Sequence, residues 1–226
     1  MITNALHAWV LHKRWSGDTS AQVTFFTREQ GIFSGLCKGG RTPKKQSLLQ
    51  AFIPLWIVVD ARGDWHYVQK IEIISPSLNL TGSALFASLY INELLHHLLR
   101  PCDPHPLLYE AYVHALHALT VVSDRLPIEV ILRRFEEGLL ASCGYQLILT
   151  DDLDGVPIHP DKEYTFIAGD GFVLADKGIK GVHILAFAED KLNDIEVLKS
   201  AKWIMRRAID HALDGKPIKA RELYGR

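Results

Sequence analysis

The spacing of apolar residues changes once along the chain, near Pro76, and this change constrains the fold more than any other feature. Before Pro76, short apolar runs alternate with turn-forming residues, which is typical of all-β domains. After it, apolar residues recur every three or four positions, as in amphipathic helices, among them Leu85, Leu89, Leu95 and Leu99. We therefore predict an α+β protein, with a β domain at residues 1–79 and a mainly helical domain at residues 80–226.

Five strands are predicted in the first domain. They cover residues 5–12, 21–27, 32–37, 52–59 and 65–74. A glycine-rich basic loop, residues 38–45, separates the third strand from the fourth, and a helical turn is expected at residues 47–50. A five-stranded set with a helical insert after the third strand fits an OB-type β-barrel. An SH3-like barrel fits the number of strands almost as well.

The second domain is predicted to be a helical bundle with a small β hairpin. Three helices are expected at residues 83–99, after Pro104, and from Pro127 to Gly144, and a last one at 194–213. Between them lies a β insert near residues 147–176, in which Gly169-Asp170-Gly171 has the composition of a hairpin turn.

The composition bears on membrane insertion and on cysteine chemistry. No apolar run approaches the roughly 18 residues that cross a bilayer, and no leader-like segment begins the sequence, so we expect a cytoplasmic protein with no membrane partner. The three cysteines, Cys37, Cys102 and Cys143, are far apart and form no CxxC pair. This spacing predicts neither a disulfide framework nor a cysteine zinc site.

Charge is distributed unevenly along the chain, although the net charge is only −1. Residues 1–79 carry nine Lys and Arg against five Asp and Glu, and residues 199–226 carry eight against three. The middle of the chain, residues 80–198, carries eight against eighteen. Two basic ends around an acidic middle are compatible with binding of nucleic acid at the ends.

Catalytic motifs are weak, and we predict that the protein is not an enzyme. The run from Gly35 to Thr42 reads GxxxxGRT, whereas a phosphate-binding P-loop needs lysine in place of Arg41. The run also continues a predicted strand of an antiparallel meander, and no parallel βαβ unit surrounds it. No GxSxG motif is present.

Two groups of side chains leave a metal-dependent helical enzyme as an alternative. Glu93 and His96 have the ExxH spacing of di-metal sites, and the next predicted helix carries Glu110, His114 and His117. Di-iron sites draw on more inward-facing glutamates than these helices provide, so we predict no metal and no cofactor. From the residues alone, a generic nucleic-acid-binding module is the other alternative.

Nine short segments, taken in order, resemble the RecO family of recombination mediators. They lie at residues 8–12, 18–20, 26–31, 38–41, 49–55, 89–95, 132–136, 144–145 and 216–224. The first five match the strands and basic loop of the family's OB domain, the next three match its helices, and the last matches its terminal signature. The resemblance extends over nearly the whole chain.

Membership of this family implies a function in DNA repair and recombination, through the RecF pathway and in association with the nucleoid. Such a protein binds single- and double-stranded DNA, anneals complementary single strands, and engages single-strand-binding protein and RecR. It also assists the loading of RecA onto single strands.

The basic loop is the predicted DNA-binding site. The resemblance places DNA contacts on Lys38 and Arg41, and Lys44 and Lys45 add to the density of positive charge in the same loop. Arg14 and Arg28 are further candidates for phosphate binding. Three aromatic residues of the β domain are candidates for base stacking, although strand aromatics more often serve the core: Trp15, Phe26 and Phe33.

The predicted partner site is the segment Leu132 to Glu136, which matches the family's helix for the acidic tail of single-strand-binding protein. Arg133 is the first candidate for contact with the tail, and Arg134 is adjacent to it. An ion pair on the helix surface with Glu129 or Glu137, each four residues from Arg133, is the alternative role.

The chain departs from many members of the family at one point. Those relatives carry a four-cysteine zinc site in the C-terminal domain, whereas residues 147–182 contain no cysteine here. We therefore predict that a chelator such as EDTA leaves both the melting temperature and DNA binding of the purified protein unchanged. A marked fall in either quantity, reversed by added zinc, would reveal a metal site built from other ligands.

Overall fold

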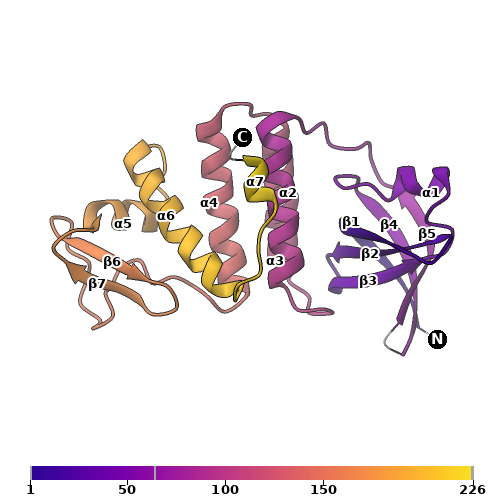
Figure 1. Cartoon of the computed structure of the whole chain (residues 1–226), viewed down its shortest axis with the longest axis horizontal. Coiled ribbons are helices and arrows are strands. Elements are labelled where there is room, and N and C mark those ends of the chain that lie inside the picture. Colours follow the sequence, from indigo (N-terminus) through magenta and orange to yellow (C-terminus); the bar gives the residue numbers. More distant parts are fainter. Residues whose placement is uncertain (1, 64, 225–226) are drawn as a thin grey trace. The chain divides into compact units, whose positions relative to one another are not determined.

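The computed structural model describes residues 2–63 and 65–224 (Figure 1). Met1, Asp64, Gly225 and Arg226, which the two predicted domains include, lie outside the described residues. The chain divides into two compact units, one of residues Met1–Val121 with Ile218–Arg226 and one of residues Val122–Pro217.

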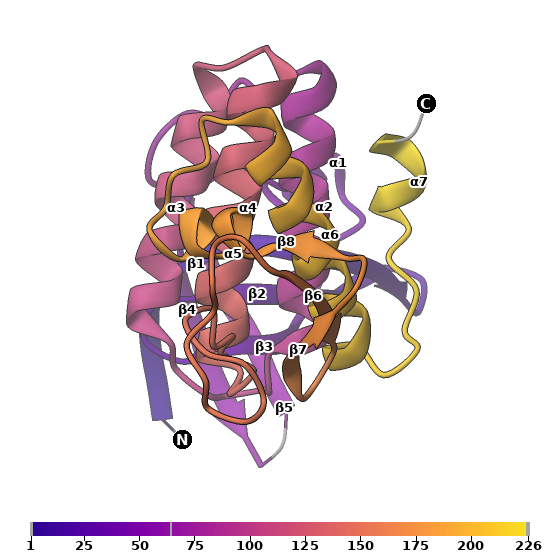
Figure 2. The same ribbon diagram turned by 90° about the vertical axis from the view of Figure 1, so that its left-hand side faces the viewer.

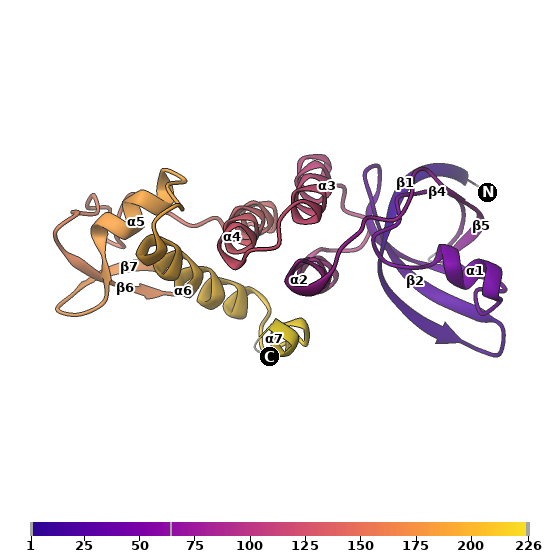
Figure 3. The same ribbon diagram turned by 90° about the horizontal axis from the view of Figure 1, so that it is seen from above.

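Five strands form a closed barrel in the first unit. They are β1 (Ile2–Ser16), β2 (Ser20–Thr27), β3 (Gly31–Cys37), β4 (Leu55–Arg62) and β5 (Trp65–Ile73). The barrel closes in the order β1-β2-β3-β5-β4, and every pair is antiparallel except β3 with β5. The predicted five-stranded OB-type barrel is confirmed. Figure 3 shows the strands from above, curving round to enclose the interior.

Side chains along β2 point alternately into the barrel and out of it, and this alternation determines which of them fill the core. Val23 and Phe25 point inward and belong to the apolar core, together with Phe33 of β3 and Leu55 and Ile57 of β4. The side chains between them, such as Gln22, point to the outer face, because successive residues of a strand lie on opposite sides. Thr24 of β2 and its partner Ser34 of β3 share this outer face with Gln22.

A short helix, α1 (Pro43–Leu48), follows β3 and lies beside the barrel (Figure 3). It begins four residues before the helical turn expected at residues 47–50. Proline suits the first turn of a helix, because the amide hydrogen that it lacks has no partner there, and Pro43 occupies this position. The prediction placed the turn too late because it did not use Pro43 as a start signal.

Three helices complete the first unit: α2 (Gly82–Leu98), α3 (Pro106–Thr120) and α7 (Ala220–Tyr224). The Trp9 indole donates a hydrogen bond of 3.1 Å to the Tyr109 hydroxyl, and the Phe26 ring lies 5.4 Å and 5.5 Å from the rings of Tyr109 and Tyr112. Residues of α3 thus cover the outer side of β1 and β2 at one end of the barrel. The domain boundary predicted at residue 79 falls between β5 and α2.

Glu93 of α2 holds the start of α7. Its two carboxylate oxygens accept hydrogen bonds from the backbone N–H groups of Lys219 and Ala220, at 2.9 Å and 2.8 Å. These are donors that a helix start leaves without intrahelical partners. Glu93, considered above as a metal ligand, therefore links α2 to α7.

The second unit combines helices with a three-stranded sheet, as predicted for a mainly helical region with a small hairpin. Its helices are α4 (Arg125–Ser142), α5 (Gly181–Ala188) and α6 (Ile195–Ala212). The strands are β6 (Glu163–Ile167), β7 (Gly171–Ala175) and β8 (Ile179–Lys180), in the order β7-β6-β8. Figure 2 shows the sheet with α5 and α6 beside it. None of the described helices is long and apolar enough to span a membrane.

Candidate nucleic-acid interface

The basic loop folds back against the start of β2. The Arg41 amide donates to the Thr19 carbonyl at 3.0 Å, and the Gly40 amide donates to the Cys37 carbonyl at 3.1 Å. A Cβ atom on Gly40 would lie 2.7 Å from the Cβ of Ala21, so only glycine allows this close approach. The backbone thereby fixes where Lys38 and Arg41 leave the barrel.

Two of the four cations of the loop lie over different aromatic rings. The Lys38 ammonium is 5.9 Å from the centre of the Tyr67 ring on β5, and the Arg41 guanidinium is 5.2 Å from the centre of the Trp15 ring on β1. Both cationic side chains are exposed. Attraction between a cation and the face of an aromatic ring holds each side chain close to its ring.

Each ring has a second cation nearby. The Lys13 ammonium lies 5.5 Å from Trp15, and the Arg62 guanidinium lies 5.3 Å from Tyr67. Lys13 also donates to the Leu49 carbonyl at 2.9 Å, which anchors it to the chain after α1. Arg62 contacts the carboxylate of Asp60 at 2.9 Å.

The prediction from sequence missed Lys13, Arg62 and Tyr67. Lys13 stands next to Arg14, Arg62 lies between two predicted strands, and Tyr67 reads as an ordinary strand aromatic. The parallel pairing of β3 with β5, which sets Leu36 beside Tyr67, brings Tyr67 to the loop. No local signal encodes that pairing, because residues of the two strands are about thirty positions apart.

The remaining predicted cations separate into two groups. Lys44 and Lys45 lie in α1, at the end of the basic loop, and Lys45 donates a hydrogen bond of 2.6 Å to the Lys38 carbonyl. Arg14 lies on the outer face of β1, where its guanidinium donates two hydrogen bonds, of 2.6 Å and 2.9 Å, to the Gln22 side chain. Arg28 follows the other end of β2 and forms an ion pair of 2.9 Å with Glu110 of α3. The structure brings all predicted cations except Arg28 to one end of the barrel.

Burial separates the three aromatic candidates for stacking. Trp15 is 47% exposed, whereas Phe26 and Phe33 are 0% and 2% exposed. Phe26 packs on α3 and Phe33 belongs to the barrel core. Of the three, only the Trp15 ring is accessible to a nucleobase.

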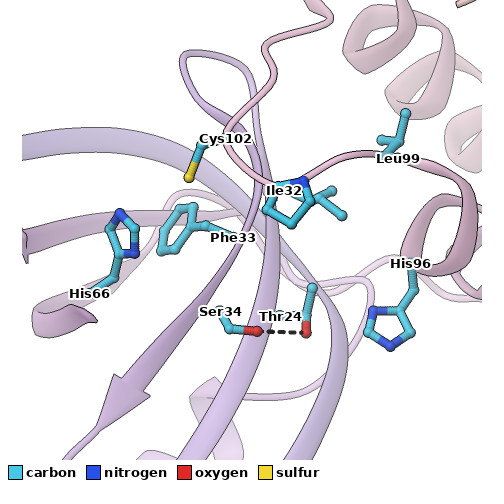
Figure 4. A pocket seen from close by; sticks show the side chains of 9 residues that line it. Thr24, Ile32, Phe33, Ser34, His66, His96, Leu99 and Cys102 are labelled. Atoms are coloured by element: carbon cyan, nitrogen blue, oxygen red, sulfur yellow. Dashed lines mark hydrogen bonds between the residues drawn. The ribbon is translucent and has the colours of Figure 1, made fainter. Parts of the chain in front are cut away.

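A hollow of about 310 Å³ continues the outer face along β2 and β3 (Figure 4). The hydroxyls of Thr24 and Ser34 lie 3.4 Å apart at its floor, and His66 and His96 lie at its two sides. In OB barrels generally, the face of strands two and three and the loops after strands one and four bind oligonucleotides. The hollow lies on the face of β2 and β3, and the basic loop, which follows β3, is bonded to Thr19 in the turn after β1.

One cysteine lies directly beside the basic loop. Cys37, directly before Lys38, is buried, and burial raises the pKa of its thiol to about 12 although the charge of Lys45 lowers it. A neutral thiol is a poor nucleophile. Within residues 2–63 and 65–224, no group of three or more potential metal ligands is present.

On α4, Arg133 is buried within a charged network. Its guanidinium lies 2.6 Å from the carboxylate of Glu136 and 3.5 Å from that of Glu129, and Lys202 of α6 also bonds to Glu129. Arg133 is only 4% exposed. The ion pair with Glu129 considered from the sequence is therefore present, but it is buried, and the second partner is Glu136 rather than Glu137.

Arg134, by contrast, is exposed. It forms an ion pair of 2.8 Å with Asp190 at the end of α5. Burial, together with the charge of Asp190, raises the pKa of the adjacent Glu137 carboxyl above its usual value. Of the two predicted partner-binding arginines, Arg134 is the one exposed to solvent.

Comparisons with known proteins cover the whole chain. The family model described as "Recombination protein O N terminal" matches residues 1–77, and "Recombination protein O C terminal" matches residues 79–222. A DNA repair protein RecO from Legionella pneumophila strain Corby is 54% identical, covering 100% of this chain and 99% of its own length. Proteins of the same name from Pseudoalteromonas atlantica and Methylococcus capsulatus are 36% and 34% identical, covering 99% and 96% of this chain and 95% and 91% of their own.

The buried network on α4 yields a stability prediction. Arg133→Ala removes the cation that both buried carboxylates contact, and we expect the free energy of unfolding to fall by about 3–5 kcal/mol. Arg134→Ala on the same helix removes an exposed ion pair and is the matched control, with an expected loss of at most about 1 kcal/mol. Urea denaturation followed by circular dichroism measures both, and equal losses would contradict the assignment of Arg133 to a buried network.

Proposed function

Because the chain belongs to the RecO family of DNA repair proteins, we propose that it acts as a recombination mediator that binds and anneals single-stranded DNA. The observation that carries this proposal is that Lys38 and Arg41 lie exposed beside two aromatic rings at one end of an OB barrel. No covalent bond needs to form or break in such a reaction.

Annealing requires that two polyanions approach each other. Cations that neutralise phosphates lower the repulsion between the strands and release bound counterions, so binding weakens as salt rises. Lys38, Arg41 and Lys44 are exposed at one end of the barrel, where they can contact successive phosphates. Double-stranded DNA can bind to the same cations through its backbone.

We also propose that the second unit engages the acidic C-terminal tail of single-strand-binding protein. Arg134 supports this role as an exposed cation on α4, next to a buried arginine and apolar side chains of the same helix. Arg133 can contribute only if it exchanges part of its bonding with Glu129 and Glu136 for the tail. Binding to RecR and assistance in loading RecA are further parts of the proposed function, as is a place in the cytoplasm near the nucleoid.

The loop is tested by reversing its charge. Lys38→Glu with Arg41→Glu is expected to weaken binding to a single-stranded oligonucleotide and to make the plot of log affinity against log salt less steep, because fewer counterions are released. Fluorescence anisotropy at several salt concentrations measures both quantities.

The control reverses two exposed lysines of the second unit, Lys177 and Lys191, and thus changes the net charge equally. We expect this variant to keep most of the affinity and slope of the wild type. If the loop variant and the control behave alike, the loop is not the DNA-binding site.

The tail site is tested separately, with Arg134→Ala and Arg133→Lys. The lysine keeps a cation within the buried network while losing the planar fork of the guanidinium. A charge-assisted hydrogen bond is worth about 1.5–3 kcal/mol, so each variant that loses a contact should bind a labelled tail peptide roughly tenfold to hundredfold more weakly.

Arg125→Ala is the matched control, because Arg125 is an exposed arginine at the start of the same helix. Naked single-stranded DNA provides the second comparison. Unchanged peptide affinity in both arginine variants would exclude them from the tail site. A parallel loss of DNA binding would assign them to the nucleic-acid surface instead.

A further inference from the structure

Two cation–aromatic groups lie next to the basic loop: Trp15 with Lys13 and Arg41, and Tyr67 with Lys38 and Arg62. We propose that these rings are two stacking platforms for unpaired bases, so that this end of the barrel selects single-stranded over double-stranded DNA. The inference rests on the proposed DNA binding by the loop. It adds Tyr67, Arg62 and Lys13 to the site and gives each a role.

The positions of the two rings follow from the barrel. Tyr67 is paired with Leu36 across the parallel contact of β3 with β5, on the outer face, since its neighbour Val68 belongs to the barrel core. Lys38 follows Leu36 by two residues and reaches the same side. Trp15 lies at the end of β1, and its ring is 47% exposed. The loop joins the two sites, because Lys38 and Arg41 are only three residues apart.

A cation beside each ring can neutralise the phosphate of a nucleotide whose base stacks on that ring. A base presents a π face that can take the place of a cation over the ring, and the displaced ammonium or guanidinium then meets the phosphate of the same nucleotide. Stacking and neutralisation of charge are thus supplied together. Bases in a duplex are stacked on each other and leave no face for a protein ring, so only an unpaired strand can use both contributions.

A third cation–aromatic pair on the barrel differs in the origin of its cation. Lys70 lies 5.3 Å from the Trp56 ring and also forms an ion pair of 2.7 Å with Glu72. Lys70 belongs to β5 and not to the basic loop, whereas Trp15 and Tyr67 each have a cation of the loop beside them. Trp56, which is partly exposed like Tyr67, is therefore a matched control for the loss of an aromatic ring from the barrel.

The test compares three DNA probes of equal length: a thymidine oligonucleotide, the same oligonucleotide with abasic sugars at its central positions, and a duplex. Base stacking on a protein ring is worth about tenfold to hundredfold in affinity for each base. We expect Tyr67→Leu and Trp15→Leu each to lose a factor of this size for the thymidine oligonucleotide and little for the other two probes. Tyr67→Phe keeps the ring and should keep the affinity, and Trp56→Leu should change none of the three.

A measurement on the wild type covers the case in which a leucine variant does not fold. The fluorescence of 2-aminopurine, placed centrally in the single strand, should fall when the protein binds, because the base stacks on a ring. Equal wild-type affinity for thymidine and abasic oligonucleotides, without quenching, would overturn the proposal. An equal loss for all three probes in Tyr67→Leu would also overturn it, since the ring would then only position cations.

The outcomes separate this inference from the proposed function. If Lys38→Glu with Arg41→Glu abolishes DNA binding while both leucine variants bind as the wild type does, the loop binds phosphates and the rings do not stack bases. If the charge reversal has no effect on DNA binding, the proposed site itself is wrong.

Discussion

The aromatic cluster of Trp9, Phe26, Tyr109 and Tyr112 determines which part of the barrel stays open. Its two hydroxyls are buried among rings, and burial raises the pKa of Tyr109 to about 12. A buried polar group is tolerated only when it is hydrogen-bonded. The Tyr109 hydroxyl accepts a hydrogen bond from the Trp9 indole, and the Tyr112 hydroxyl donates one of 2.8 Å to Asn92 of α2. Each buried hydroxyl therefore has a partner. The cluster covers one end of β1 and β2 with α3 and leaves the end with the basic loop uncovered.

The same division explains why the predicted cations differ in their surroundings. Arg28 follows the covered end of β2 and is partly neutralised by Glu110 of α3. Lys38 and Arg41 leave the uncovered end, where aromatic rings are their neighbours. A ring carries no net charge, so unlike a carboxylate it leaves the positive charge of the cation available to a phosphate. Placement on the barrel, more than the number of basic residues, therefore decides which of them keep a positive charge that no neighbouring carboxylate offsets.

Local patterns predicted the strands of the barrel and of the β6–β7 hairpin, the long helices and the basic loop, because alternation, helical spacing and glycine-rich turns can be read from neighbouring residues. They did not predict α5, whose sequence GVHILAFA is too short and too uniformly apolar for its period to be read, or α7, which depends on Glu93 more than 120 positions away. The roles of Tyr67 and Arg62 were missed for the same reason as α7. These roles arise only when the barrel closes, because pairing between distant strands cannot be read from short segments of sequence.

Burial also changes the role expected of Arg133. Its spacing from Glu129 is that of an ordinary surface pair, yet the structure encloses both groups together with Glu136. Such networks are costly to desolvate and add little net stability, but removing one member leaves a buried charge behind. Arg133 is therefore suited to holding α4 in one arrangement with α6, through Glu129 and Lys202. An exposed neighbour such as Arg134 can then meet an acidic partner without disturbing the interior, so that support and recognition fall to adjacent residues of one helix.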